Sequence, residues 1–305
     1  MCNLELTVLP TSMASLIEIE ADAFIIGEAE YALRLPNYFS HDEVIDAIKH
    51  IKRKHKKIYL AINKIIHEYE LEKFESYINE MLHDIDGFIF GDLSVYQMAK
   101  RLGVVNKLIY HPETYVTNYE TVNFYGRKQI KRVSIAKEIT LEDIEMIGTK
   151  SSLEVEVMGH GAINMFHSKR DLVTNYFQFI KDEEPTNHHN KELYLIEEKR
   201  QDEKYPIIED QNGTHIFSGY DLCTVNYLDH LIESGITSIR IDGFFKSDKV
   251  LKEIVSVYKK AITDYQLSKE TYLTNKQDYL DLLNNIDGIR PFNTGFLFKK
   301  TVYKG

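Results

Sequence analysis

Short apolar runs alternate with longer amphipathic segments along most of the chain. The runs are rich in Val, Ile and Phe, which is typical of strands buried on both faces of a parallel sheet. They predict strands at residues 4–9, 23–26, 57–62, 87–90, 107–110, 132–136, 153–157 and 238–241.

The amphipathic segments between these runs predict helices. Segment 41–55 places Val44, Ile48 and Ile51 on one face, and segment 71–82 has a similar apolar spacing. Residues that suit a helix N-cap are Ser40, Asp92 and Thr140.

Regular alternation of strands and helices indicates βαβ units and a parallel sheet. Eight strands over roughly 250 residues is the pattern of a (β/α)₈ barrel of the TIM type. The alternative is an open, doubly wound sheet, which usually has fewer strands. The sequence lacks the Gly-x-Gly-x-x-Gly turn that would favour that alternative.

The alternation breaks between residues 166 and 217, where the chain is polar and contains an Asn212-Gly213 pair typical of a tight hairpin turn. We predict a β-rich insertion there, after the seventh strand. Helices are then expected at 220–234 and 246–265. Residues 1–265 would form the barrel with its insertion, and residues 266–305 a helical and extended tail that packs on the barrel.

Composition narrows the class of protein. The 305 residues carry a net charge of −10, which counts against nucleic-acid binding by bulk electrostatics but permits a local basic patch. The two cysteines, Cys2 and Cys223, are too far apart for a metal knuckle or a disulfide framework. We see no signal peptide and no apolar stretch of about 20 residues. We therefore expect a cytoplasmic protein outside the membrane.

Polar residues follow the predicted strands, and barrel enzymes place their reactive groups at these strand ends. We predict catalytic roles for Glu138, His160 and Asp242. The predicted substrate-binding residues are Asn63, Asp92, Lys137, Arg240 and Lys246, and Glu28 and Glu113 also end strands. The alternative is that these side chains are polar because strand ends meet solvent.

His160 lies between two glycines, which we expect to turn the backbone and expose the imidazole. It would then act as a general base, a substrate donor or a metal ligand; otherwise it bonds to its own loop. His167, His188 and His189 show no supporting ligand spacing, and we predict no metal site.

Lys49, Lys52, Arg53, Lys54, Lys56 and Lys57 form a basic cluster near the end of the second predicted helix. Of these, Lys52, Arg53 and Lys56 are our candidates for contacts with RNA phosphates. A solvated helix face is the alternative. The sequence contains neither a Gly-x-Ser-x-Gly elbow nor a His-Glu-x-x-His motif, so the residues themselves give no support to a protease mechanism.

Several ordered motifs together resemble the peptidase U32 family over nearly the whole chain. They lie at residues 21–27, 57–63, 116–120, 135–144, 157–161, 197–200, 221–223, 235–243 and 292–296. The resemblance implies a (β/α)₈-like fold and a part in prephenate-dependent hydroxylation of tRNA wobble uridine to 5-hydroxyuridine. The alternatives are a peptidase, as the family name states, and a non-catalytic scaffold with a pocket.

Departures from the family pattern matter as well. The resemblance places Asn164, Asp171, approximately His189, and Cys223 where cluster-bearing members carry four cysteines. Thiolates normally hold such clusters, so we expect no iron–sulfur cluster in this chain. Two family arginines are also replaced, within Gly243-Phe-Phe-Lys246 and Phe292-Asn-Thr-Gly295. The chain resembles short, cysteine-poor members that act with a longer, cluster-bearing paralogue, and the implied partners are that paralogue, tRNA and a small carboxylate such as prephenate.

Overall fold

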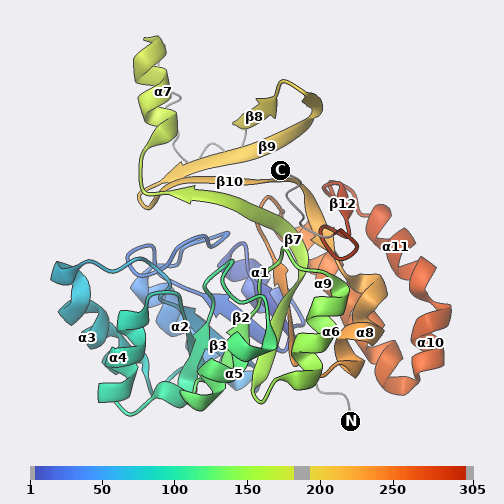
Figure 1. Cartoon of the computed structure of the whole chain (residues 1–305), viewed down its shortest axis with the longest axis horizontal. Coiled ribbons are helices and arrows are strands. Elements are labelled where there is room, and N and C mark those ends of the chain that lie inside the picture. The colour runs from blue at the N-terminus through green and yellow to red at the C-terminus, as the bar shows by residue number, and fades with distance from the viewer. Residues whose placement is uncertain (1–3, 182–192, 300–305) are drawn as a thin grey trace.

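A closed barrel of parallel strands forms the body of the molecule (Figure 1). The computed structural model describes residues 4–181 and 193–299. Strands β1 to β7 pair in chain order, and β11 closes the barrel by pairing with both β7 and β1. The barrel strands are β1 (Glu5–Leu9), β2 (Ala23–Ile26), β3 (Lys57–Ala61), β4 (Gly87–Phe90), β5 (Leu108–Tyr110), β6 (Arg132–Ser134), β7 (Glu154–Ser168) and β11 (Ser238–Asp242).

A helix follows each barrel strand and packs on the outside, which confirms the predicted (β/α)₈ class. These helices are α1 (Met13–Glu18), α2 (His41–Arg53), α3 (Leu71–Met81), α4 (Leu93–Arg101), α5 (Tyr119–Arg127), α6 (Leu141–Lys150), α8 (Leu228–Glu233) and α9 (Asp248–Leu267). Ser40, Asp92 and Thr140 are N-caps as predicted, and Ser40 and Thr140 form capping boxes.

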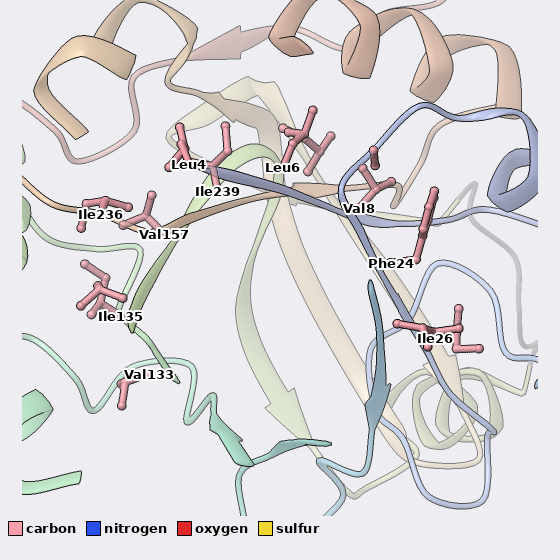
Figure 2. Close-up of a cluster of buried hydrophobic side chains, with 14 of the residues drawn as sticks. Leu4, Leu6, Val8, Phe24, Ile26, Val133, Ile135, Val157, Ile236 and Ile239 are labelled. Carbon is pink, nitrogen blue, oxygen red and sulfur yellow. The ribbon is translucent and has the colours of Figure 1, made fainter. Parts of the chain in front are cut away.

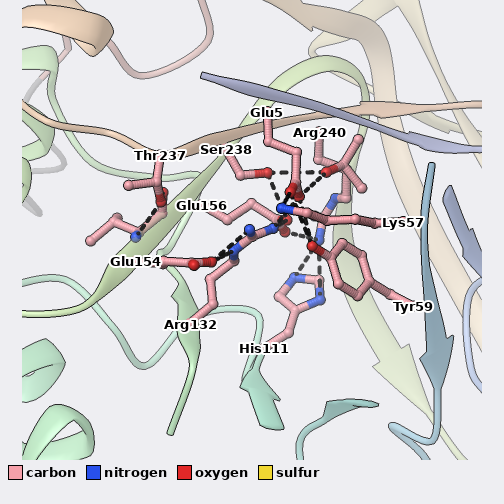
Figure 3. A network of polar contacts seen from close by, with 12 residues as sticks. Glu5, Lys57, Tyr59, His111, Arg132, Glu154, Glu156, Thr237, Ser238 and Arg240 are labelled. Atoms are coloured by element: carbon pink, nitrogen blue, oxygen red, sulfur yellow. Dashed lines mark hydrogen bonds and ion pairs between the residues drawn. The ribbon is translucent and has the colours of Figure 1, made fainter. Parts of the chain in front are cut away.

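The main hydrophobic core lies between the strands and the surrounding helices (Figure 2). Leu6, Val8 and Phe24, for example, are at most 1% exposed. The inside of the barrel is divided. Strands β1 to β5 contribute a smaller apolar cluster that includes Ile25 and Ile89, whereas β1, β3, β5, β6, β7 and β11 contribute a network of charged and polar groups (Figure 3).

A long antiparallel ribbon extends from the barrel. Strand β7 continues past the barrel to Ser168 and pairs with β10 (Gly213–Cys223). The other edge of β10 pairs with β9 (Arg200–Asp210), and β9 in turn pairs with β8 (Tyr194–Glu197). The Asn-Gly turn joins β9 to β10 as predicted. Helix α7 (Leu172–Ile180) projects from the far end of the ribbon (Figure 1). The insertion therefore contains a helix as well as strands.

One predicted helix begins too early. The segment 220–234 was expected to be helical throughout, but Tyr220–Cys223 continue β10 and α8 begins only at Leu228. Cross-strand pairing with β7 fixes these residues as a strand.

The described part of the tail packs against the barrel. It contains α10 (Lys269–Thr274), α11 (Lys276–Asn284) and the short strand β12 (Phe292–Asn293), which pairs with β10. The Tyr272 hydroxyl donates to the Val225 carbonyl at 2.7 Å. Within residues 4–181 and 193–299, we find no helix with the length and apolar character needed to cross a bilayer.

Candidate functional site

A small cavity lies at the carboxyl ends of the barrel strands, and we call it the mouth cavity. Four of the predicted site residues line it, from the ends of three strands: Asn63 after β3, Lys137 after β6, and Arg240 and Asp242 in β11. The structure thus gathers side chains that are far apart in the sequence. His111, Glu113 and Arg34 also line the cavity.

Glu113 forms ion pairs with two other residues that line the mouth cavity. Its carboxylate accepts from Lys137 Nζ at 2.6 Å and lies 3.1 Å from Arg34 Nη2. Burial alone would raise the pKa of Glu113, but the Lys137 and Arg34 cations hold it well below its usual range. Glu113 is therefore ionised and fixes the position of Lys137.

Arg240 of β11 also lines the mouth cavity, and its guanidinium contacts a carboxylate and a histidine. Its Nη1 lies 3.3 Å from Glu156 Oε1 and 3.2 Å from both ring nitrogens of His111 (Figure 3). Burial and the Arg240 charge lower the pKa of His111 well below its ordinary value, so this imidazole is neutral. Within the described residues, Arg240 Nε is buried without a hydrogen-bond acceptor. It is an available donor beside the cavity.

Asp242 is the carboxyl group best suited to proton transfer. Its Oδ1 accepts from the Phe244 backbone N–H at 2.9 Å, and burial raises its pKa. Gly161 passes so close that a Cβ there would meet Asp242 Cβ at 2.6 Å. The glycine after His160 is thus required by the packing of Asp242. A buried carboxyl whose pKa is raised holds a proton more readily than an ordinary Asp, which suits it to a role in proton transfer.

Access to the mouth cavity is restricted in this conformation. Its volume is about 40 Å³, which is room for a few waters and too small for an organic substrate. Residues 33–35, from the loop after β2, line it together with Phe217 and Phe244. Binding of a carboxylate here requires that these residues move.

His160 does not line the mouth cavity. Its side chain is 0% exposed, so the predicted exposure of the imidazole is wrong. The ring packs beside Tyr258 of α9 and Phe292 of the tail, with centroids 5.8 and 6.0 Å away. Burial lowers its pKa, and the ring is therefore neutral. The two glycines allow β7 to bulge at this point. The glycine–histidine–glycine motif gave no sign that the C-terminal tail would cover the imidazole.

Asp221 lies next to His160 and anchors a second charged group. Its Oδ2 lies 2.7 Å from Lys246 Nζ and 3.6 Å from His160 Nε2, and its Oδ1 accepts from Arg290 at 2.6 Å. Burial would raise the pKa of Asp221, but Lys246, His160 and Arg290 lower it well below normal. Lys246, a predicted substrate-binding residue, thus pairs with a buried carboxylate. Sequence reasoning assigned no site role to Asp221 or Arg290, although both stand in or beside the family motifs.

Three other strand-end residues point elsewhere. Asp92 caps α4 and accepts from the Ile66 N–H at 3.1 Å. Glu28 faces outward and bonds the Tyr77 hydroxyl at 2.6 Å. Glu138 is half-buried and does not line the mouth cavity. The catalytic role of Glu138 and the substrate role of Asp92 remain predictions without geometric support.

The basic cluster lies at the opposite end of the barrel. Helix α2 ends at Arg53 and β3 begins at Lys57, so Lys52, Arg53 and Lys56 flank the amino ends of the strands. Lys52 lies 3.8 Å from Asp84. Contacts from this cluster to RNA would be made far from the mouth cavity.

The positions implied for an iron–sulfur cluster do not converge. Cys223 lies opposite His160 in the β7–β10 ladder, whereas Asp171 follows Ser168 at the far end of the ribbon. At 3.3 Å per residue, the eight residues between these levels span roughly 26 Å. Asn164 lies between them, and His188 and His189 fall outside the described residues. Within those residues no group of three or more His, Cys, Asp or Glu side chains could hold a metal ion. These residues do not fit a cluster.

Comparison with known proteins agrees with this architecture. The model of peptidase family U32 matches residues 10–304. The chain is 36% identical to tRNA hydroxylation protein P2 of Bacillus subtilis over 305 residues, covering 98% of this chain and 99% of that protein. It is 28% identical to an uncharacterized protease of Methanocaldococcus jannaschii, covering 95% and 71%. It is 25% identical to tRNA hydroxylation protein P1 of B. subtilis, covering 90% and 66%.

Proposed function

The chain belongs to peptidase family U32, and we propose that it is a subunit of a system that hydroxylates wobble uridine in tRNA to 5-hydroxyuridine. The observation that carries the proposal is the match to tRNA hydroxylation protein P2 over almost the full length of both proteins. No large insertion or missing domain separates the two chains.

The proposed partner is a longer paralogue. Proteins P1 and P2 of one organism both match this chain, and the chain spans only 66% of P1. The longer paralogue would hold the iron–sulfur cluster, and this chain would hold none. That division agrees with the scattered positions of Asn164, Asp171 and Cys223. A small carboxylate such as prephenate would be the second substrate of the complex.

Within this chain the mouth cavity is the proposed site for a carboxylate. Lys137 after β6 and Arg240 in β11 offer cationic donors from either side of β7, and Asn63 borders the same space. Asp242 would hold or release a proton beside the bound group. We expected Lys246 to bind substrate and His160 to act in catalysis. Both side chains instead contact Asp221, where they support the wall formed by β10 and the tail.

One group of residues in the structure resembles the catalytic residues of a peptidase. Cys223, His160 and Asp221 adjoin one another in the β7–β10 ladder, and they are the residue types of a cysteine-protease triad. The thiol is 5% exposed, however, and burial raises its pKa to about 11. The nucleophile of such enzymes is an accessible thiolate. The geometry therefore favours the hydroxylation subunit over the peptidase.

The experiment that tests the proposal compares modified nucleosides in tRNA from cells with and without this chain, by mass spectrometry. Loss of wobble 5-hydroxyuridine derivatives is expected in the deletion strain, and a plasmid copy of the gene should restore them. Purification of the tagged chain should also recover the longer paralogue. Unchanged nucleosides would refute the proposed function.

A further inference from the structure

A cationic groove runs between the β8–β9 hairpin and the body of the protein, and we call it the arm groove. Its volume is about 1050 Å³, at the upper end of the ~300–1,000 Å³ typical of ligand sites. The hairpin forms one wall, and Phe245 and Lys246 with the tail segment at Arg290 and Pro291 form the other. Its size is large enough to admit a segment of an extended chain.

The charge of the arm groove opposes that of the whole protein. Five cations line it against two carboxylates, in a chain whose net charge is −10. The lining charges are Lys199, Arg200, Lys204, Lys246 and Arg290, with Asp202 and Glu203. Asp221 forms ion pairs with Lys246 and Arg290 and so offsets part of this positive charge. Arg200 lies 3.1 Å from Glu197. Arg200 also lies 3.7 Å from Glu203, and the lining as a whole still carries three more cations than carboxylates.

Aromatic rings are interleaved with these cations. Tyr194 is 47% exposed and lies under Lys204, with Nζ 5.8 Å from the ring centroid. Arg290 stacks on Phe245 at 4.8 Å. A cationic trough with accessible rings is the arrangement that binds unpaired nucleic acid, because phosphates contact the cations and bases stack on the rings.

The arm groove also adjoins the mouth cavity. Phe245 packs against Phe217 at 5.2 Å, and Phe217 packs against Phe244 at 4.8 Å. Phe217 and Phe244 line the mouth cavity. A strand in the groove would therefore contact Phe245, which packs directly on the wall of the proposed carboxylate site, whereas the basic cluster lies at the other end of the barrel.

From these observations we infer that the arm groove binds an unpaired RNA segment, such as the anticodon loop of tRNA. The inference rests on the proposed function, since it takes tRNA as the substrate. It assigns RNA contact to Lys199, Arg200 and Lys204 in place of Lys52, Arg53 and Lys56.

The test measures binding of a labelled anticodon stem–loop RNA across a range of salt concentrations. The variant Lys199→Glu/Arg200→Glu/Lys204→Glu is compared with Lys52→Glu/Arg53→Glu/Lys56→Glu, which changes the net charge by the same amount. All three groove residues lie on the surface hairpin, so the fold should be retained. Removing one phosphate interaction should lower the slope of log K against log salt by about 1. For the groove variant we expect the slope to fall by about 3 and the affinity at low salt to fall at least tenfold.

Tyr194→Ala provides a second variant, which should weaken binding of the stem–loop and leave binding of a fully duplex RNA unchanged. Loss of binding in the basic-cluster variant with retention in the groove variant would overturn the inference. Equal competition by polyglutamate, or no binding by the wild-type chain with or without its paralogue, would also overturn it. Nucleoside analysis of the deletion strain tests the function separately: if 5-hydroxyuridine is lost there but groove variants restore it fully, only the groove assignment fails.

Discussion

His160 Nε2 lies 3.6 Å from Asp221 Oδ2, and both side chains are completely buried between the β7–β10 ribbon and the C-terminal tail. Asp221 is ionised because Lys246 and Arg290 flank it, and His160 is neutral because burial lowers its pKa. The residue that the sequence marks as the most chemically suggestive thus belongs to an interior contact. The candidate groups for chemistry, Lys137, Arg240 and Asp242, line the separate mouth cavity.

Replacement of Asp221 by Asn should be strongly destabilising. The variant leaves Lys246, whose side chain is 1% exposed, without its carboxylate. Breaking a buried ion pair on one side typically costs about 3–5 kcal/mol. Denaturant unfolding measures the change. Asp46→Asn is the control, because Asp46 pairs with Lys49 on the surface, and the loss should be below about 1 kcal/mol. Similar stabilities for the two variants would contradict this account of Asp221.

Acid should remove the stabilisation that Glu5 provides inside the barrel. Burial raises the pKa of Glu5, but Arg132 and Lys57 outweigh burial and lower it from 4.5 to about 2. A lowered folded-state pKa means that stability is fully present above pH 4.5 and is lost as the pH falls toward 2. The shift corresponds to about 3 kcal/mol.

The check is the free energy of unfolding of wild type and Glu5→Gln between pH 7 and pH 2. The gap between the two proteins should be widest above pH 4.5 and should narrow toward pH 2. A gap that stays constant with pH would show that Glu5 acts through packing alone.

Asp242→Asn should abolish tRNA modification in cells while the protein stays folded. Asn keeps an oxygen that can accept from the Phe244 N–H, but it cannot exchange a proton. Asp92→Asn is the matched control, since Asn also caps helices well and Asp92 lies outside the mouth cavity. Equal activity of the two variants would remove Asp242 from the proposed chemistry.

Cys223→Ala should retain modification activity. The thiol is buried beside the Tyr258 hydroxyl at 3.6 Å, and burial raises its pKa, so on our proposal it is neither a nucleophile nor a cluster ligand. Protein purified without oxygen should contain almost no iron or sulfide, in wild type and variant alike. Stoichiometric iron in the wild type that disappears in Cys223→Ala would show that this chain carries a cluster.

The barrel was predictable because its strands are short, apolar and separated by amphipathic helices with clear caps. The mouth residues Asn63, Lys137, Arg240 and Asp242 were predictable for the same reason, since they stand where strands end. What failed depends on distant pairing. Residues 220–223 became a strand through contact with β7, and the tail buried His160. Neither periodicity nor local composition records such contacts.

Some site residues had no sequence signal of their own. Arg34 reaches Glu113 from a loop, with a positive φ of 53°. Arg290 reaches Asp221 across 69 residues. Helix α7 was also missed, because its nine residues follow a polar stretch and none of them is buried. Its apolar residues fall inside an interval that we read as β-rich, and the turn at Asn212-Gly213 favoured strands there.

The central claim is that this chain is required for hydroxylation of tRNA wobble uridine. Its most direct test is quantitative mass spectrometry of nucleosides from tRNA of the deletion strain, complemented with wild type, Asp242→Asn or empty vector. We predict that 5-hydroxyuridine derivatives disappear with empty vector and Asp242→Asn and return with wild type. Unchanged levels in the deletion strain, together with peptide cleavage by the purified protein that Cys223→Ala abolishes, would contradict the account and favour a peptidase.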